Sequence, residues 1–368
     1  METSSSAAAA TETATNLLQL PQDSLHQIFS GLPLRQVLQC RSVCRALLHT
    51  LSSPSFLLHH QHYHNTPSLP LLSLRPSQHH HHHHHHNNQP PPPPPPPHHL
   101  LSFDLLLRRW LRLPLHFLPF PPPLLPVTSS PQGLLFLWAP TPDSSSSLSL
   151  VAANPITRTH RVLPPLGSAW SRHGTVLAGG GGGGGGGEVI VLTEIAALVY
   201  GGGGEWRKYS TNLPSKPRSP VAVGGRVVAL CDVGSPWRSH WKMYWCPGCW
   251  EGGGGARLLM VGGLKSSFSI NAACSTIVIL RLDLGTLQWD EAGRMPPEMF
   301  TCFQETSKFK VFGGGERVCF SARRLKRLAV WDCSDGGKGD WTWIDGVPES
   351  GDGLCRGFFY EASLTAVL

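Results

Sequence analysis

The sequence has few charged residues. Asp, Glu, Lys and Arg make up 14% of its 368 residues, compared with about 25% in an average soluble domain. Glycine and proline are abundant instead, with 39 and 34 residues, and this combination predicts low-complexity inserts and a turn-rich β-structure.

The formal net charge of +7 is compatible with an acidic partner. The densest basic cluster is interrupted by Leu325, and such a pattern also describes the solvent-exposed face of a strand. Nucleic acid is therefore not the expected partner. The members of this cluster are Arg323, Arg324, Lys326 and Arg327.

The sequence also lacks a membrane span and a secretory signal. No window reaches the ~18 uninterrupted apolar residues that a spanning helix needs. The leucine-rich stretch between Leu100 and Leu125 is interrupted by Asp104, several Arg and several Pro. The N-terminus METSSSAAAA carries an acidic residue and only a short alanine run, unlike a signal peptide. We therefore expect no membrane partner and an intracellular location, in the nucleus and/or the cytoplasm.

No cysteine framework is present. The ten cysteines are scattered, as reduced thiols of an intracellular protein are. Cys246 and Cys249 form a lone CxxC, and a zinc site would need a second pair at ligand spacing. The run Gly179–Gly187 satisfies GxGxxG trivially, but a strand-like segment follows it where a dinucleotide site needs a helix. We therefore predict no metal and no cofactor.

The most informative stretch is Leu20 to Phe56, which has a helical apolar period. One face carries Leu25, Ile28, Phe29 and Leu32 at i, i+3, i+4 and i+7. Pro21 and Pro33 suit the first turns of two helices, Ser42 suits the cap of a third, and Pro54 is expected to end it. A segment below about 40 residues rarely buries a self-sufficient core, so we expect a partner protein to cover its apolar face.

This stretch resembles the F-box, the motif by which substrate adaptors dock on the Skp-type subunit of SCF ubiquitin ligases. The matching features are Leu20-Pro21, Asp23, Leu25, Ile28-Phe29, Leu32-Pro33, Leu38, Arg41, Val43-Cys44-Arg45 and Ser53-Pro54-Ser55-Phe56. Leu47 stands where many plant members carry Trp. The resemblance implies a small all-α unit of three helices. The residues that it implies at the Skp-type interface are Leu20, Pro21, Leu25, Ile28, Phe29, Leu32, Pro33, Leu38, Val43 and Cys44.

Composition divides the chain into four parts. Residues 1–16 contain mainly Ser, Thr and Ala and are expected to be disordered. Residues 17–60 form the F-box-like unit. Residues 61–99 are expected to be a low-complexity linker with eight histidines, His79 to His86, and eight prolines, Pro90 to Pro97. Residues 100–368 carry a repeat.

The repeat places an Asp or Asn six residues before an aromatic residue. Asp104 precedes Trp110, Asn154 precedes His160, and Asp283 precedes Trp289. With further anchors at 201 and 332, the separations are 50, 47, 82 and 49 residues. Since 82 is close to two units, about six units fit, each long enough for four short strands. The sequence thus predicts an all-β propeller of about six blades.

The repeats resemble kelch repeats, most clearly over residues 257–349. The pairs Gly262-Gly263 and Gly313-Gly314 each end an apolar strand, and a Met295-Pro296 step follows a spaced Trp. Together the features resemble a plant F-box/kelch-repeat protein. We expect Trp206, Trp289, Trp341 and Trp343 to pack between blades.

The resemblance implies a non-catalytic adaptor. The F-box would hold a Skp-type subunit, and through it cullin and RING subunits, while the propeller would hold an unknown protein to be ubiquitinated. Aromatic and basic loop residues are the expected substrate contacts, namely Trp237, Arg238, His240, Trp241, Lys265 and Phe268.

Two alternatives remain open. One is an F-box protein that acts outside degradation, for instance as a transcriptional cofactor. The basic cluster near Arg323 is the feature that supports it. The other is a copper oxidase on a kelch-type propeller. Its candidate ligands, His116, His160, His173 and His240 with Tyr200, Tyr209, Tyr244 and Tyr360, show no clustered spacing.

Overall fold

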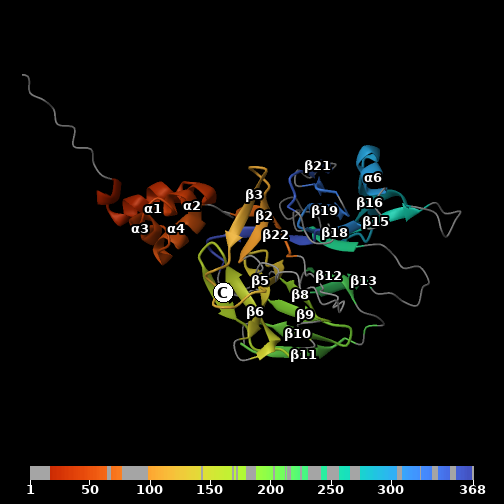
Figure 1. Cartoon of the computed structure of the whole chain (residues 1–368), viewed down its shortest axis with the longest axis horizontal. Coiled ribbons are helices and arrows are strands. Elements are labelled where there is room, and N and C mark those ends of the chain that lie inside the picture. The colour runs from red at the N-terminus through yellow and green to blue at the C-terminus, as the bar shows by residue number, and fades with distance from the viewer. Residues whose placement is uncertain are drawn as a thin grey trace, which may run out of the picture. The chain divides into compact units, whose positions relative to one another are not determined.

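The structure, a computed structural model, divides into two compact units, Met1–Pro67 and Ser68–Leu368. It describes residues 17–63, 68–76, 98–141, 144–167, 170, 173–179, 188–201, 204–211, 213, 217–223, 226–230, 242–246, 257–265, 274–304, 309–323, 325–333, 339–348 and 354–366. Figure 1 shows helices in the first unit and mainly strands in the second.

The described residues of the first unit form four α-helices, where three were predicted. A 3-10 turn (Leu17–Gln19) precedes α1 (Gln22–Ser30), α2 (Leu34–Arg41), α3 (Arg45–Thr50) and α4 (Pro54–Tyr63). Pro21 and Pro33 stand directly before α1 and α2, as expected. The cap of α3 is the Cys44 thiol, which accepts a hydrogen bond from the Leu47 amide at 3.5 Å, and not Ser42. Pro54 does not end a helix. It begins α4, because the first helical position needs no N–H.

This unit has its own apolar core. Val37, Leu51 and Phe56 are fully buried, and Leu25 and Phe29 are 5% exposed. The α4 helix is tied to the rest of the unit by His60, which hydrogen-bonds to the Leu32 carbonyl oxygen at 3.2 Å. Because α4 contributes Phe56, it completes a core that the three predicted helices would have left open.

The second unit contains five four-stranded antiparallel sheets and one two-stranded sheet in the described parts of the chain. The first two sheets are β22-β1-β2-β3 (Gly357–Ser363, Ser68–Leu74, His99–Asp104, Arg109–Pro114) and β4-β5-β6-β7 (Leu125–Ser129, Leu135–Thr141, Ser144–Asn154, Thr159–Val162). They are followed by β8-β9-β10-β11 (Thr175–Ala178, Val189–Leu192, Ala196–Tyr200, Trp206–Ser210) and by the two-stranded sheet β12-β13 (Arg218–Val223, Arg226–Leu230). The last two are β14-β15-β16-β17 (Lys242–Cys246, Arg257–Lys265, Cys274–Asp283, Trp289–Arg294) and β18-β19-β20-β21 (Phe309–Gly314, Arg317–Ala322, Leu328–Asp332, Asp340–Ile344). One helix, α6 (Pro297–Gln304), packs against the core of the last two of these sheets.

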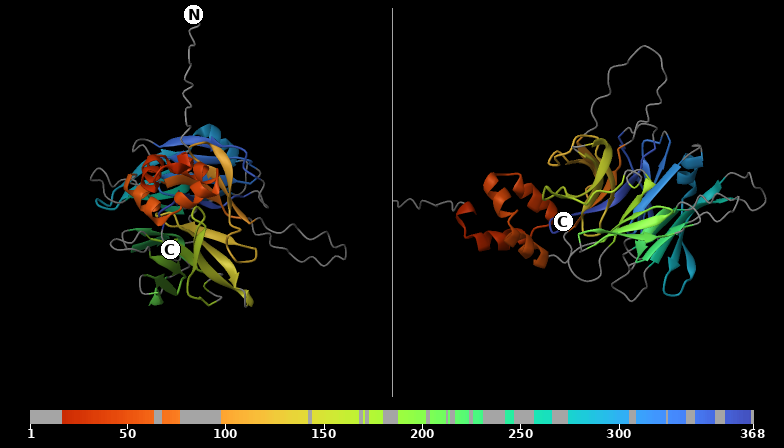
Figure 2. Two further views of the ribbon diagram at one scale, coloured as in Figure 1. Left: turned by 90° about the vertical axis from the view of Figure 1, so that its left-hand side faces the viewer. Right: turned by 90° about the horizontal axis from the view of Figure 1, so that it is seen from below.

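These sheets are the blades of an all-β propeller, with five complete blades where about six were predicted. The strands β22, β4, β8, β12, β14 and β18 contact one another in that order around the centre. Figure 2 shows the separate sheets from two further sides. The two-stranded sheet β12-β13 therefore lies between two complete blades.

The first blade joins the two ends of the unit. Its strand β1 pairs with β22 along its whole length, with Leu71 opposite Tyr360. Figure 1 shows the blue β22 beside the orange strands of this blade. Residues 68–74 lie in the stretch predicted to be a linker, but they form a strand because the C-terminal segment gives their backbone a hydrogen-bonding partner.

The predicted repeat corresponds to one recurring hairpin between the last two strands of a blade. In each, the Asp or Asn side chain accepts N–H groups two and three residues later: Asp104 from Leu106 and Leu107, Asn154 from Ile156 and Thr157, and Asp283 from Gly285 and Thr286. Four residues after the anchor, Arg108, Arg158 and Leu287 have φ of 51°, 59° and 56°. The side-chain oxygen holds the turn and the left-handed residue reverses the chain, so the aromatic residue arrives on the next strand six positions later.

The predicted inter-blade tryptophans differ in their burial. Trp341 and Trp343 pack against the cluster formed by α6 and two neighbouring blades. Trp206 donates a hydrogen bond to the Pro164 carbonyl at 2.9 Å. Trp289 is 47% exposed, so the prediction was wrong for this residue. Among the tryptophans whose burial the structure describes, Trp331 is the most deeply buried, with 1% of its surface exposed.

Candidate binding surfaces

The helical unit exposes several apolar side chains although it has a core. Val43 is 72% exposed, Ile28 49% and Leu20 36%. Leu17, Leu48 and Leu58 are exposed as well. Exposed apolar side chains that gather in a patch are typical of a protein interaction site, and these residues are available for such a role.

The predicted Skp-type contacts fall into three groups by burial. Exposed residues are Leu20, Pro21, Ile28, Pro33 and Val43, and partly buried residues are Leu32, Leu38 and Cys44. Leu25 and Phe29 are buried within the unit itself. Ile28 and Phe29 differ in exposure because they are neighbours in α1, where consecutive side chains point in different directions around the helix. Ile28 points outward, and Phe29 points into the core.

The predicted substrate contacts fall mostly outside the described residues. Trp237, Arg238, His240, Trp241 and Phe268 all lie there. Lys265 is the last residue of β15, where it pairs with Cys274 at a register irregularity.

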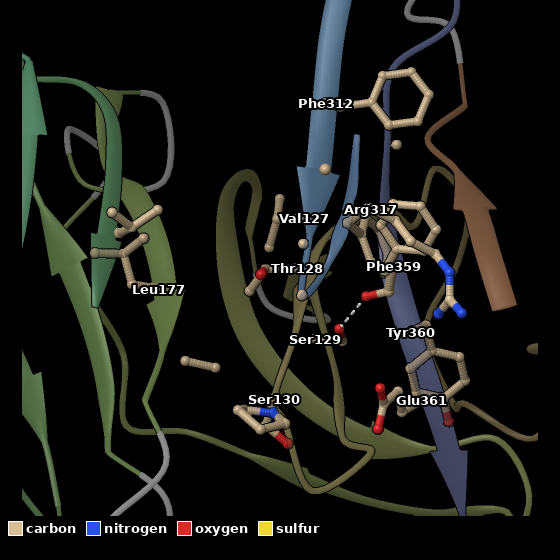
Figure 3. Close-up of a pocket in the computed structure, with 18 of the residues that line it drawn as sticks. Val127, Thr128, Ser129, Ser130, Leu177, Phe312, Arg317, Phe359, Tyr360 and Glu361 are labelled. Carbon is tan, nitrogen blue, oxygen red and sulfur yellow. Dashed lines mark hydrogen bonds between the residues drawn. The ribbon is translucent and has the colours of Figure 1, made fainter. Parts of the chain in front are cut away.

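The propeller contains a cavity of about 800 Å³ along its centre. Most of the lining of this channel comes from five of the central strands, β4, β8, β12, β18 and β22, and Arg75 and Arg356 lie beside them. Residues of β1 and β19 also contribute, among them Leu71 and Arg317. In Figure 3, Val127 to Ser130 and Phe359 to Glu361 lie on neighbouring strands, and the Ser129 hydroxyl donates to the Phe359 carbonyl oxygen at 2.6 Å. The Ser129 side chain therefore links β4 to β22, two neighbouring strands that border the channel.

Arg75 is the most perturbed basic group of this cavity. Its guanidinium donates to the Val127 carbonyl oxygen and lies 5.9 Å from the centre of the Phe358 ring. Arg75 keeps solvent-accessible surface, but the protein atoms around it displace much of its water. This desolvation, together with the nearby charge of Arg356, lowers the pKa of Arg75 to about 10. Sequence reasoning missed both arginines, since Arg75 falls in the predicted linker and Arg356 lies 281 positions later.

The copper-site candidates with printed ring contacts or burial have separate surroundings, and His240 lies outside the described residues. His160 packs edge-on against Phe120, and Tyr200 packs against Trp206. The Tyr360 side chain is completely buried, and this burial raises the pKa of its hydroxyl. Within the described ranges, no group of three or more His, Cys, Asp or Glu is placed so as to hold a metal ion.

None of the helices described here is long and apolar enough to cross a membrane.

Comparison with known proteins identifies the class. Residues 17–59 match the F-box domain family, so the chain is an F-box protein with a C-terminal β-propeller. It is 51% identical to SKP1-interacting partner 15 of Arabidopsis thaliana over 376 aligned positions, which cover 94% of this chain and 97% of the relative. The chain therefore belongs to the plant F-box protein family that includes SKP1-interacting partner 15.

Solved structures resemble the chain only distantly. A protein from Bacteroides fragilis has 10% identity and a TM-score of 0.34, covering 79% of this chain and 98% of its own. Apo AztD from Citrobacter koseri has 8% identity and a TM-score of 0.31, covering 80% and 98%.

Proposed function

We propose that this protein is a substrate-recognition adaptor of an SCF-type ubiquitin ligase. The observation that carries the proposal is the F-box match over a helical unit that keeps Ile28 and Val43 exposed after its own core is complete. The name of the relative, a SKP1-interacting partner, supports the same role. The F-box docks a Skp-type subunit, and through it the cullin and RING subunits.

The exposed members of the predicted set make the direct contacts in this proposal. Leu20, Pro21, Ile28, Pro33 and Val43 have accessible surface to bury, with Leu32, Leu38 and Cys44 at the edge. Leu25 and Phe29 act by keeping the unit folded, because their side chains have little surface left for a partner.

The propeller holds the protein to be ubiquitinated. No chemistry by this chain is required, because placing a substrate lysine near activated ubiquitin raises its effective concentration. We also infer that β12-β13 is the inner half of a sixth, kelch-type blade, since β12 lies between β8 and β14 in the ring of central strands. The proposed compartment is the nucleus and/or the cytoplasm.

Reconstitution tests this proposal. The full chain is co-expressed with Skp-type, cullin and RING subunits, and the assembly is followed by size-exclusion chromatography. We expect one complex of all four proteins that stimulates ubiquitin chain formation on a bound substrate. If the chain elutes alone, the adaptor role is wrong.

The non-degradative alternative predicts the same assembly but a different outcome in cells. Bound proteins of a degradation adaptor accumulate when the proteasome is inhibited, whereas those of a non-degradative scaffold keep their levels. Quantitative proteomics of proteins captured with and without inhibitor separates the two.

A further inference from the structure

Basic side chains from distant parts of the sequence meet at one end of the propeller channel. Arg75 directly follows β1, and Arg356 directly precedes β22. The Arg75 amide donates to the Arg356 carbonyl oxygen at 2.8 Å, which places the two residues side by side. They belong to one end of the channel because antiparallel pairing puts the last residue of β1 beside the first residue of β22.

Lys310 lies at the same end. It is the second residue of β18, which neighbours β22. A Cβ atom at Gly357 would lie 2.9 Å from the Phe312 ring, and one at Gly314 would lie 3.6 Å from the Phe359 side chain. Gly357 therefore lies beside Phe312, and Phe359 lies beside Gly314, so β22 and β18 run in the same direction. Lys310 comes two residues before Phe312 and is accordingly level with the residues just before Gly357.

We call these three cations the basic mouth (Arg75, Lys310 and Arg356). Among the residues that the structure describes, none of the three forms an ion pair with a carboxylate. Arg317, another basic group of the lining, is bound to Asp332 at 2.6 Å. Two carboxylates belong to the lining, and both lie away from this end. Glu361 is near the last residues of β22, and Glu316 is in the turn that follows the last residue of β18.

The two arginines of the basic mouth repel each other. Like charges that lie close together repel, and the charge of Arg356 is the second cause, after desolvation, of the lowered pKa of Arg75. A bound anion would relieve the repulsion and could accept charge-assisted hydrogen bonds from both guanidinium groups.

We propose that the basic mouth binds an acidic segment of the protein that the propeller recognises, through a carboxylate or phosphate group seated between Arg75, Lys310 and Arg356. This inference rests on the proposed adaptor function. A peptide segment suits the site better than a small free anion for two reasons. The cavity of about 800 Å³ is far larger than one oxyanion. Its lining also includes the partly exposed apolar side chains of Val127, Val311 and Phe359, which can hold the residues next to the acidic group.

Peptide binding tests the proposal directly. The full chain in complex with a Skp-type protein is titrated into fluorescein-labelled peptides of equal length, one rich in Glu and Leu and one with Gln in place of each Glu. A phosphoserine version of the Gln peptide tests phosphate as the anionic group. Fluorescence anisotropy gives the dissociation constants at low and high salt.

The key variant is the triple substitution Arg75→Gln, Lys310→Gln and Arg356→Gln. Its matched control removes three positive charges from exposed residues of outer strands, Arg112→Gln, Arg207→Gln and Lys208→Gln. Because Arg75 bonds to the backbone, the double variant Lys310→Gln and Arg356→Gln is measured as well, and circular dichroism checks the fold of all three proteins.

We expect an acidic peptide to bind the wild type and the charge control equally, and to bind the triple variant at least about tenfold more weakly, a loss of one charge-assisted contact. Rising salt should weaken the wild-type affinity. Equal binding of the Gln peptide, or unchanged affinity in both folded mouth variants, would overturn the proposal. Competition by inorganic phosphate at the same concentration as the peptide would also overturn it, since the site would then hold a small anion.

Failure of this inference is distinguishable from failure of the adaptor function. Co-purification with the Skp-type protein depends on the helical unit and is recorded on the same preparations. Retained Skp-type binding without peptide binding rejects the basic mouth alone, whereas loss of the Skp-type complex in the wild type rejects the adaptor.

Discussion

Replacing Ile28 with Glu should abolish tight docking of a Skp-type protein without unfolding the helical unit. Ile28 lies on α1 with 49% of its surface exposed. Full burial of an isoleucine side chain contributes about 1.5–3 kcal/mol, so burying the exposed half contributes about 0.8–1.5 kcal/mol. Placing an unpaired carboxylate against the apolar partner costs about a further 1–3 kcal/mol. The sum of about 2–4.5 kcal/mol corresponds to roughly 30- to 2,000-fold weaker binding.

Isothermal titration of the full chain with a purified Skp-type protein measures this loss. Leu58→Glu is the matched control, because Leu58 is also an exposed apolar residue of this unit, 69% exposed on α4, and is not among the predicted contacts. Val43→Asp provides a second test at a side chain that is 72% exposed. Far-ultraviolet circular dichroism confirms that each variant keeps its helices.

The reasoning would be refuted by a folded Ile28→Glu variant with an unchanged dissociation constant. Equal losses in Ile28→Glu and Leu58→Glu would also count against it, since the effect would then follow from added charge anywhere on the unit and not from the predicted surface.

Two further predictions concern stability. Phe56→Ala should destabilise the helical unit by about 3–5 kcal/mol, because the ring is fully buried and packs edge-on against His26 at 5.6 Å; urea unfolding followed by helical circular dichroism measures this, and a variant as stable as the wild type would mean that α4 does not complete the core. Gly357→Ala should lower the melting temperature of the propeller, since its new Cβ would lie 2.4 Å from the Ser73 carbonyl oxygen, whereas Gly314→Ala, with 3.6 Å to its nearest atom, should change it little. Differential scanning fluorimetry compares the two, and equal shifts would contradict the β1–β22 pairing.

Local patterns in the sequence were sufficient for the elements that depend on local interactions. The helical period predicted α1, and Pro21 and Pro33 marked two helix starts. The spacing of Asp104 and Asp283 from the tryptophans that follow them revealed the repeat, because it reflects a local turn in which the side chain bonds to amides only two and three residues away.

Elements that depend on distant partners could not be predicted in the same way. The strand Ser68–Leu74 has a proline within it and a low-complexity tract after it, and it forms because β22 pairs with it from the other end of the chain. The basic mouth is hidden for the same reason, since Arg75, Lys310 and Arg356 meet only when the propeller closes. Pro54 was expected to end the third helix and instead begins α4. The sequence did not distinguish the two, because a proline fits both the end of one helix and the first position of the next.

The burial pattern of the helical unit separates folding from docking. A patch of apolar residues in a short segment first suggested that a partner must cover all of them. The structure divides the same residues, since Leu25, Phe29 and Phe56 complete an internal core while Ile28 and Val43 remain at the surface. Substitutions in the first group should therefore lower stability and binding together, and substitutions in the second group should lower binding alone. Because Ile28 and Phe29 are adjacent in α1, comparing charged substitutions at these two positions distinguishes a docking surface from a core.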